Sequence, residues 1–353
     1  MRIRSTLLAL VTLLALTIAG SAPSLIAAPD FCAKRLDHPR CVATAPTPTP
    51  TPTTPPSPTP TPVAAGANLA DYGGNWATAI EASKTRGKLL IVPAGTWPAP
   101  RIFPYAGLTI RGDGRAVSIV TRTAKGAHAV GGFFHVTTAN VTISDLTIKG
   151  WPIAAGTSDD ILVNGIDATG LRILRVDLVD AQGIGIQLEG ALMSGALVED
   201  VSITNTTFRD NGYHGVALWP YNGTHDSTFR RIAIDGADYA GIFCDAGTTV
   251  GTAAGVDDNT FEDIVIRHAA RKALPAGAGI GAGWMLTGAK GNTATGWEIT
   301  DQTLGAAMAF GYDQSGLPST DNVMTGGKIG RTPQTVTYAT GLQSQNTVEW
   351  GPA

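Results

Sequence analysis

A short pattern of alternating apolar residues recurs between about residues 141 and 331, and it constrains the fold of this chain more than any other feature. The repeats begin at intervals of 26 to 33 residues, and nearly all have apolar residues at the first and third places. Alternation with a period of two is typical of a β-strand, and a regular interval of this length indicates a stacked repeat. The repeats are Leu146-Thr147-Ile148-Lys149, Val176-Asp177-Leu178-Val179, Thr206-Thr207-Phe208-Arg209 (Thr206 being the exception), Ile232-Ala233-Ile234-Asp235, Ile264-Val265-Ile266-Arg267 and Trp297-Glu298-Ile299-Thr300.

A second set of strand patterns follows these repeats after a short gap. One repeat cannot bury its apolar side alone, so neighbouring repeats must stack into a continuous core. Two or three short strands per repeat, with no helical pattern between them, predict an all-β parallel β-helix of about eight to ten coils. A leucine-rich repeat is excluded because its Leu/Asn consensus is absent. The second set is Gly183-Ile184-Gly185-Ile186, Gly215-Val216-Ala217-Leu218, Gly241-Ile242-Phe243-Cys244 and Gly279-Ile280-Gly281-Ala282.

The first 65 residues divide into three segments that precede the repeats. Residues 1–28 have the basic start and apolar run of a secretory signal peptide, and the run is too short for a membrane span. Residues 29–45 contain Cys32 and Cys41, which could close a small disulfide loop after export, whereas Cys244 is expected to be a buried apolar residue. Residues 46–65 are rich in proline and threonine and predict a stiff linker. We therefore expect a secreted or cell-surface protein, with residues 66–353 as the β-helix domain and with a linker that allows tethering to a surface.

The charge composition narrows the range of partners. Of the 353 residues only 15% are charged, the net charge is −3, and 43 residues are glycine. This near-neutral balance gives no support for binding to nucleic acid or to an anionic membrane. The high glycine content suits a solenoid with many tight corners.

The segment after the linker resembles the entry to the pectate-lyase-like superfamily of right-handed parallel β-helices. The similarity rests on a short amphipathic helix near residues 76–86, on Pro93-Ala94-Gly95-Thr96-Trp97 and on Leu108-Thr109-Ile110-Arg111-Gly112-Asp113-Gly114, and it extends over roughly residues 69–345. The resemblance implies a right-handed solenoid whose first coil is capped by the helix, which protects its open edge. Members of this superfamily include polysaccharide lyases, glycoside hydrolases, epimerases, adhesins and phage tailspikes, so the fold alone does not assign a reaction.

The second strand set is expected to carry a sugar-binding surface. If Ile184, Val216 and Ile242 point inward, the outward columns contain Gly185, Ala217 and Phe243, then Gln187, Trp219 and Asp245, then Glu189, Tyr221 and Gly247. Aromatic faces beside polar groups suit the apolar C–H faces of a sugar ring. We therefore predict Trp219, Tyr221, Phe243 and Gln187 as substrate-binding residues; the alternative is that adjacent loops cover the aromatic rings.

Four acidic residues are candidates for acid–base catalysis on this surface. Neighbouring coils lie about 4.8 Å apart, so carboxylates one or two coils apart fit the spacings of glycosidases. The pairs are Glu189 with Asp245, two coils apart, and Asp210 with Asp238, one coil apart. For Asp210 the alternative role is that of an ordinary turn residue.

His214 is a further catalytic candidate. The segment Gly212-Tyr213-His214-Gly215-Val216-Ala217-Leu218 is similar to the Gly-His-Gly strand of polygalacturonases, with one additional residue. The acid pair of that family is missing on the preceding coil, where Ala181 and Gln182 stand. This departure argues against an ordinary polygalacturonase, although His214 could still act as a general acid or base.

Several basic residues are also consistent with a lyase or epimerase reaction. Arg209 and Arg267, with His268 after them, fall in or beside the outward column of the first strand set that also holds Lys149 and Asp235. They could bind a uronate, and a lyase would call for Ca²⁺; the alternative is a surface ladder of ion pairs. No metal site or other cofactor is predicted from the sequence itself. The expected function is thus an enzyme that cleaves or modifies an extracellular polysaccharide as a hydrolase or lyase, and the alternative is a non-catalytic glycan-binding surface protein or adhesin.

Overall fold

The computed structural model describes residues 66–122, 132–150, 160–208, 214–247, 255–272, 281–312 and 316–351. All of them belong to one compact unit, Pro62–Ala353. The predicted signal peptide, cysteine-containing segment and linker lie outside the described residues, as do Arg209 and Asp210.

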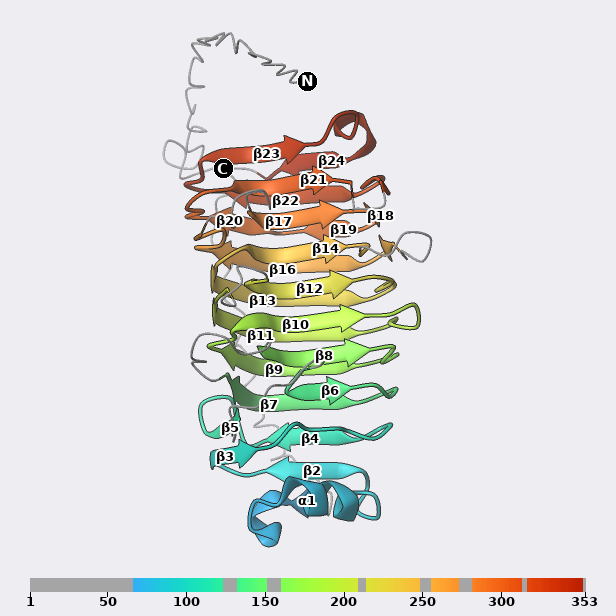
Figure 1. The fold of residues 1–353 in the computed structure, drawn as a ribbon, viewed down its shortest axis with the longest axis vertical. Helices are drawn as coiled ribbons and strands as arrows, with labels where there is room; N and C mark the ends of the chain where they lie inside the picture. Colours follow the sequence, from blue (N-terminus) through green and yellow to red (C-terminus); the bar gives the residue numbers. More distant parts are fainter. Residues whose placement is uncertain are drawn as a thin grey trace, which may run out of the picture. The chain divides into compact units, whose positions relative to one another are not determined.

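The described residues form a right-handed parallel β-helix, as expected from the repeats and from the resemblance. Two long parallel sheets run along the solenoid, and from β6 onward the chain alternates between them (Figure 1). We call the 14-stranded sheet the first sheet and the 8-stranded sheet the second sheet. The eight strands of the second sheet agree with the expected number of coils.

The first sheet has the order β1 (Ala67–Asn68), β2 (Leu89–Val92), β4 (Thr109–Gly112), β7 (Thr142–Lys149), β9 (Arg172–Val179), β11 (Leu197–Thr206), β13 (Thr228–Ala237), β16 (Thr260–Arg267), β19 (Thr293–Thr295), β22 (Val323–Ile329) and β20 (Glu298–Thr300), with β3 (Gly95–Ala99), β5 (Ser118–Arg122) and β24 (Thr347–Trp350) attached beside this path. The second sheet has the order β23 (Gln334–Tyr338), β21 (Ala306–Gly311), β17 (Ala282–Thr287), β14 (Ala240–Asp245), β12 (Val216–Tyr221), β10 (Gly183–Glu189), β8 (Asp160–Ile166) and β6 (Phe134–Val136). A small third pair consists of β15 (Val256–Asp257) and β18 (Ala289–Lys290), and the two short 3₁₀ helices are η2 (Leu69–Tyr72) and η3 (Gln343–Gln345).

The core lies between the two long sheets and is built from stacked apolar side chains. The alternation within each strand of the first sheet sends every second residue inward, and the register places these residues in columns. One such column is almost completely buried and consists of Leu178, Ile203, Ile234, Ile266 and Ile299.

One assignment of a strand to its coil was wrong. Val201 and Ile203, not Thr206 and Phe208, stack with the inward apolar residues of the neighbouring coils, because Ile203 pairs with Leu178 before it and Ile234 after it. Thr206 is the last residue of this strand. Thr206 was the one polar residue at the first place of a predicted repeat. With the inward positions of β11 assigned to Val201 and Ile203, every repeat has apolar residues at these places.

The predicted capping helix is present as α1 (Trp76–Ser83). Asn75 caps it, since its side-chain oxygen accepts a hydrogen bond from the backbone N–H of Thr78 at 3.1 Å. Trp76 is buried, and its indole N–H donates to the carbonyl of Pro98 at 3.1 Å. In Figure 1 the helix lies below β2 at the N-terminal end of the solenoid, where it covers the first coil.

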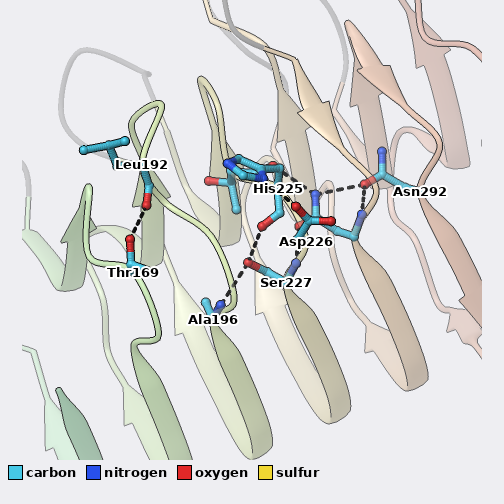
Figure 2. A network of polar contacts seen from close by, with 9 residues as sticks. Thr169, Leu192, Ala196, His225, Asp226, Ser227 and Asn292 are labelled. Atoms are coloured by element: carbon cyan, nitrogen blue, oxygen red, sulfur yellow. Dashed lines mark hydrogen bonds and ion pairs between the residues drawn. The ribbon is translucent and has the colours of Figure 1, made fainter. Parts of the chain in front are cut away.

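A ladder of buried asparagines stabilises one corner of the later coils. Asn259, Asn292, Asn322 and Asn346 stack on successive coils, and each side-chain amide donates to the oxygen of the next at 2.8–3.0 Å. Ser227 extends the ladder, because its N–H donates to Asn259 and its hydroxyl oxygen accepts from the N–H of Ala196 (Figure 2). The ladder satisfies backbone groups that the turn would otherwise bury unpaired.

Candidate functional site

Two outward columns on the second sheet bring most of the predicted site residues together. The first column runs His135, Asn164, Gln187, Trp219, Phe243 and Met285 from β6 to β17. The second runs Ile166, Glu189, Tyr221, Asp245 and Thr287 from β8 to β17. We call these the aromatic column and the carboxylate column.

The register of β14 differs from the sequence prediction by two residues. Leu218 pairs with Ile242 and Tyr221 with Asp245, so Phe243 lies beside Trp219 rather than beside Ala217. The correction moves Asp245 into the same column as Glu189, with Tyr221 between them. The pair that was predicted two coils apart is thus aligned along the solenoid axis.

The small residues near the start of these strands do not form the predicted open surface. A Cβ atom added to Gly185 would lie 2.8 Å from the Cγ2 atom of Ile203, which belongs to the opposite sheet. Glycines 241 and 283 likewise face isoleucines 266 and 299. These positions point inward, and their lack of a side chain lets the two sheets approach closely.

The aromatic rings form one continuous group on the outer face. Trp219 stacks on Phe243, with ring centres 5.7 Å apart and an interplanar angle of 7°. Tyr221 lies 5.0 Å and His214 5.1 Å from the Trp219 ring, and Tyr239 packs edge-on against Phe243 at 5.9 Å. Trp219, Tyr221 and Phe243 are half-buried, so part of each ring stays accessible. The group offers a ring surface that spans two neighbouring coils.

Glu189 lies in an environment that disfavours its charged form. Glu189 is only partly exposed, and burial raises the pKa of its carboxyl. A hydrogen bond from Asn164 lowers this pKa and offsets part of the effect, whereas the charge of Asp167 raises it further. The amide of Gln187 donates to one Glu189 oxygen at 3.1 Å. Gln187 and Asn164 are themselves buried, so they hold the carboxyl in a defined orientation.

Asp245 is held more firmly on the other side of Tyr221. Its Oδ1 atom accepts hydrogen bonds from the N–H of Gly247 at 3.1 Å and from the hydroxyl of Thr287 at 3.0 Å. Its residue exposure is 9%. The charge of this carboxylate, together with burial as the larger cause, raises the pKa of Tyr239 to about 12.

Asp238 has a structural environment instead of a catalytic one. It is fully buried, and its two oxygens accept hydrogen bonds from the Arg271 guanidinium at 3.0 Å, from the Lys272 ammonium at 2.6 Å and from the N–H of Phe208 at 2.8 Å. A carboxylate with all these donors stabilises the corner before β14 and has little capacity left for substrate. Its predicted partner Asp210 lies outside the described residues.

Two predicted basic residues lie on the other sheet. Arg267 ends β16 in the first sheet, where its guanidinium is 3.7 Å from the carboxylate of Glu298. The next residue, His268, hydrogen-bonds Asp235 at 2.7 Å. Arg267 thus takes part in a surface ion pair and His268 in a surface hydrogen bond, and both lie on or beside the first sheet and not on the strands that carry the aromatic group. Arg209 was predicted to lie beside Asp235 in the outward column of the first sheet. The register places Thr204 at that position, and Arg209 lies outside the described residues.

Four residues of the site were not predicted. Asn164 hydrogen-bonds Glu189, and Thr287 hydrogen-bonds Asp245. Tyr239 packs against Phe243, and Met285 follows Phe243 in the register. Asn164 was missed because its strand lacks the glycine that introduces the other members of the second set. A complete alignment of the coils would have found Met285 and Thr287, since they follow Phe243 and Asp245 in the register.

Within the part of the chain that the structure describes, no group of three or more His, Cys, Asp or Glu side chains is arranged to hold a metal ion. Within the same ranges, no helix combines the length and apolar character needed to cross a membrane.

Comparisons with known proteins gave matches among solved structures alone. No family model and no curated protein matches the chain. Among solved structures, the catalytic domain of a GH87 α-1,3-glucanase in complex with nigerose is 14% identical, with 84% of this chain and 70% of that chain covered and a TM-score of 0.43. PfbA, a surface adhesin of Streptococcus pneumoniae, is 11% identical over 76% of this chain and 80% of that chain, with a TM-score of 0.49. The Agl-KA catalytic domain is 19% identical over 76% of this chain but only 48% of its own, with a TM-score of 0.48. At these identities the similarity concerns the fold alone.

Proposed function

We propose that this protein is a secreted glycoside hydrolase that cleaves a polysaccharide on the outer face of the second sheet. The observation that carries the proposal is the carboxylate column, in which Glu189 and Asp245 flank Tyr221 beside the stacked rings of Trp219 and Phe243. Two coils correspond to about 9.6 Å of backbone separation at about 4.8 Å per coil. Inverting glycosidases have carboxyl groups about 6.5–9.5 Å apart and retaining ones about 5–5.5 Å, so a backbone separation of this size is nearer to the inverting arrangement.

The chemistry assigns a different role to each carboxyl. Glu189, whose pKa is raised by burial, donates a proton to the glycosidic oxygen as the bond to the anomeric carbon breaks. Asp245 takes a proton from a water molecule whose oxygen forms the new bond to that carbon. Trp219 supports the apolar face of the sugar ring, and Gln187 orients Glu189.

The activity test compares full-length wild type with Glu189→Gln and Asp245→Asn on a panel of neutral and anionic polysaccharides, with new reducing ends as the measured product. Wild type should release reducing ends, and each variant should lose at least about 100-fold in rate, since a positioned acid or base contributes 10²–10⁴-fold. Glu262→Gln, a carboxyl change on the first sheet, is the matched control. Wild-type rates in both site variants would contradict the assignment, whereas unsaturated products would indicate a lyase.

A non-catalytic glycan-binding protein is the second candidate, and one observation favours it. Asp245 already accepts two hydrogen bonds from its own fold, as a structural carboxylate would. In that case wild type would bind a glycan without releasing reducing ends. Trp219→Ala should weaken binding about 30-fold in either case, because loss of an aromatic anchor costs about 2 kcal/mol.

A further inference from the structure

The aromatic column continues beyond the catalytic candidates to the N-terminal end of the solenoid. Ile102 forms a parallel bridge with Phe134, so the next residue, Phe103, lies beside His135 as the first member of the column. The rings of Phe103 and His135 meet edge-on with centres 5.6 Å apart. Phe103 is 57% exposed, so its ring is accessible to a ligand at the outer face of the column.

A cation accompanies this exposed ring. The guanidinium of Arg101 lies 5.0 Å from the centre of the Phe103 ring, and its Nε–H donates to the carbonyl of Gly132 at 3.1 Å. These two contacts fix the orientation of the guanidinium. Within the described ranges, Arg101 and His135 take part in no ion pair, unlike the arginines of the first sheet.

The local electrostatics favour an anionic ligand. Burial and the positive charge of Arg122 lower the pKa of Arg101, and burial and Arg101 lower the pKa of His135. Burial is the larger cause of both shifts, and the nearby positive charges of Arg122 and Arg101 add to it. The buried Nδ1 atom of His135 and the buried Oδ1 atom of Asn164 on the next coil have no hydrogen-bond partner in the structure. Polar atoms without partners are costly unless a ligand or water satisfies them.

We propose that Arg101, Phe103 and His135 form a distal subsite for an anionic sugar residue of the same polysaccharide that the central site binds. The proposal rests on the proposed function, because it requires the glycan to continue along the column from Glu189. Three coils separate Phe103 from Gln187, or about 14 Å at about 4.8 Å per coil. Phe103 would stack on the sugar, and Arg101 would pair with its carboxylate or sulfate.

The test measures binding by full-length protein carrying Glu189→Gln, so that hydrolysis does not consume the probe. The probes are polygalacturonate and alginate for carboxylates, dextran sulfate for sulfate, and dextran as the neutral polymer. At least one anionic polymer should bind. Adding Arg101→Met or Phe103→Ala should weaken its binding at least about tenfold, and added salt should reduce the effect of Arg101→Met. Binding of a carboxylate polymer but not of dextran sulfate would identify carboxylate as the group recognised. Binding of dextran sulfate but not of a carboxylate polymer would identify sulfate.

Two matched controls separate the subsite from general surface effects. Arg331→Met removes an arginine whose side chain is 92% exposed and distant in the sequence, and Leu192→Ala removes an exposed apolar side chain. Equal losses in the controls, or no binding of any anionic polymer, would overturn the subsite.

Chain length provides a second readout that does not depend on the binding probes. In the wild-type background, Arg101→Met should slow cleavage of long chains of the bound polymer but leave short oligosaccharides, which do not reach the subsite, unchanged. Equal effects on both lengths would refute a distal subsite. Failure of the proposed function is distinguishable, because it would appear as wild-type hydrolysis in Glu189→Gln, or as no release of reducing ends by wild type, whatever the binding result at Arg101.

Discussion

Glu189 shows how one residue can be poised for chemistry at the expense of stability. Its neighbours Gln187 and Asn164 donate hydrogen bonds, yet burial is the largest effect and leaves the pKa above its ordinary value. A carboxyl in this state resembles the general acid of a glycosidase, which must carry a proton near the working pH. The fold therefore stabilises the protonated form that the proposed reaction needs.

The raised pKa predicts a specific pH dependence of stability. Between the unfolded and folded pKa values the native state binds more protons, so the free energy of unfolding falls as pH rises through this window. Glu189→Gln, which cannot ionise, should therefore be more stable than wild type at neutral pH and similar to it below the ordinary glutamate pKa. Chemical denaturation at both pH values measures this difference, with Glu262→Gln as the control. A variant that is less stable at neutral pH would contradict the buried-acid environment.

At the scale of the element, the strands were easier to predict than their alignment. The alternation in Ile264-Val265-Ile266 identifies a strand of the first sheet correctly, because each coil buries apolar residues at its inward places. Two predicted alignments are wrong: Thr206 pairs with Ala237 and not with Ile232, and Phe243 lies beside Trp219 and not beside Ala217. Residue patterns define strand faces, whereas hydrogen bonds between coils define register, and those depend on corner lengths that vary from coil to coil.

The asparagine ladder makes an energetic prediction for the corner that joins the coils. Asn292 accepts from the N–H and amide of Asn259 and donates to Asn322 and to the carbonyl of Val256. Asn292→Ala should lower the free energy of unfolding by about 3 kcal/mol, since several buried groups lose their partners at about 1–3 kcal/mol each. Urea denaturation measures the loss. Asn346→Ala, at the partly buried end of the ladder, should cost less, and equal costs would show that the stacking is not cooperative.

At the scale of the whole molecule, each coil contacts mainly its neighbours, so damage at one end should remain local. The cap α1 tests this property. Trp76→Ala should cost about 3–5 kcal/mol of local stability, because a large buried side chain and its hydrogen bond to Pro98 are lost. Hydrogen exchange should accelerate in β1 and β2 but not in β12 or β14, and the exposed first coil should promote association.

Trp350→Ala is the control for the cap, since this tryptophan of the last strand is 52% exposed. Light scattering should detect association only in Trp76→Ala. Accelerated exchange throughout the solenoid would instead indicate that the coils unfold as one cooperative unit.

Because Glu189 and Asp245 lie in one column, a large change in the distance between them requires the addition or removal of a whole coil. Point mutations move the carboxyls by fractions of an ångström, but deletion of one complete coil would bring them about 4.8 Å closer along the axis. That single step passes from the separation of an inverting enzyme to that of a retaining one. In a stacked fold, the stereochemistry of the product can thus depend on an integer, the number of turns of chain between two side chains.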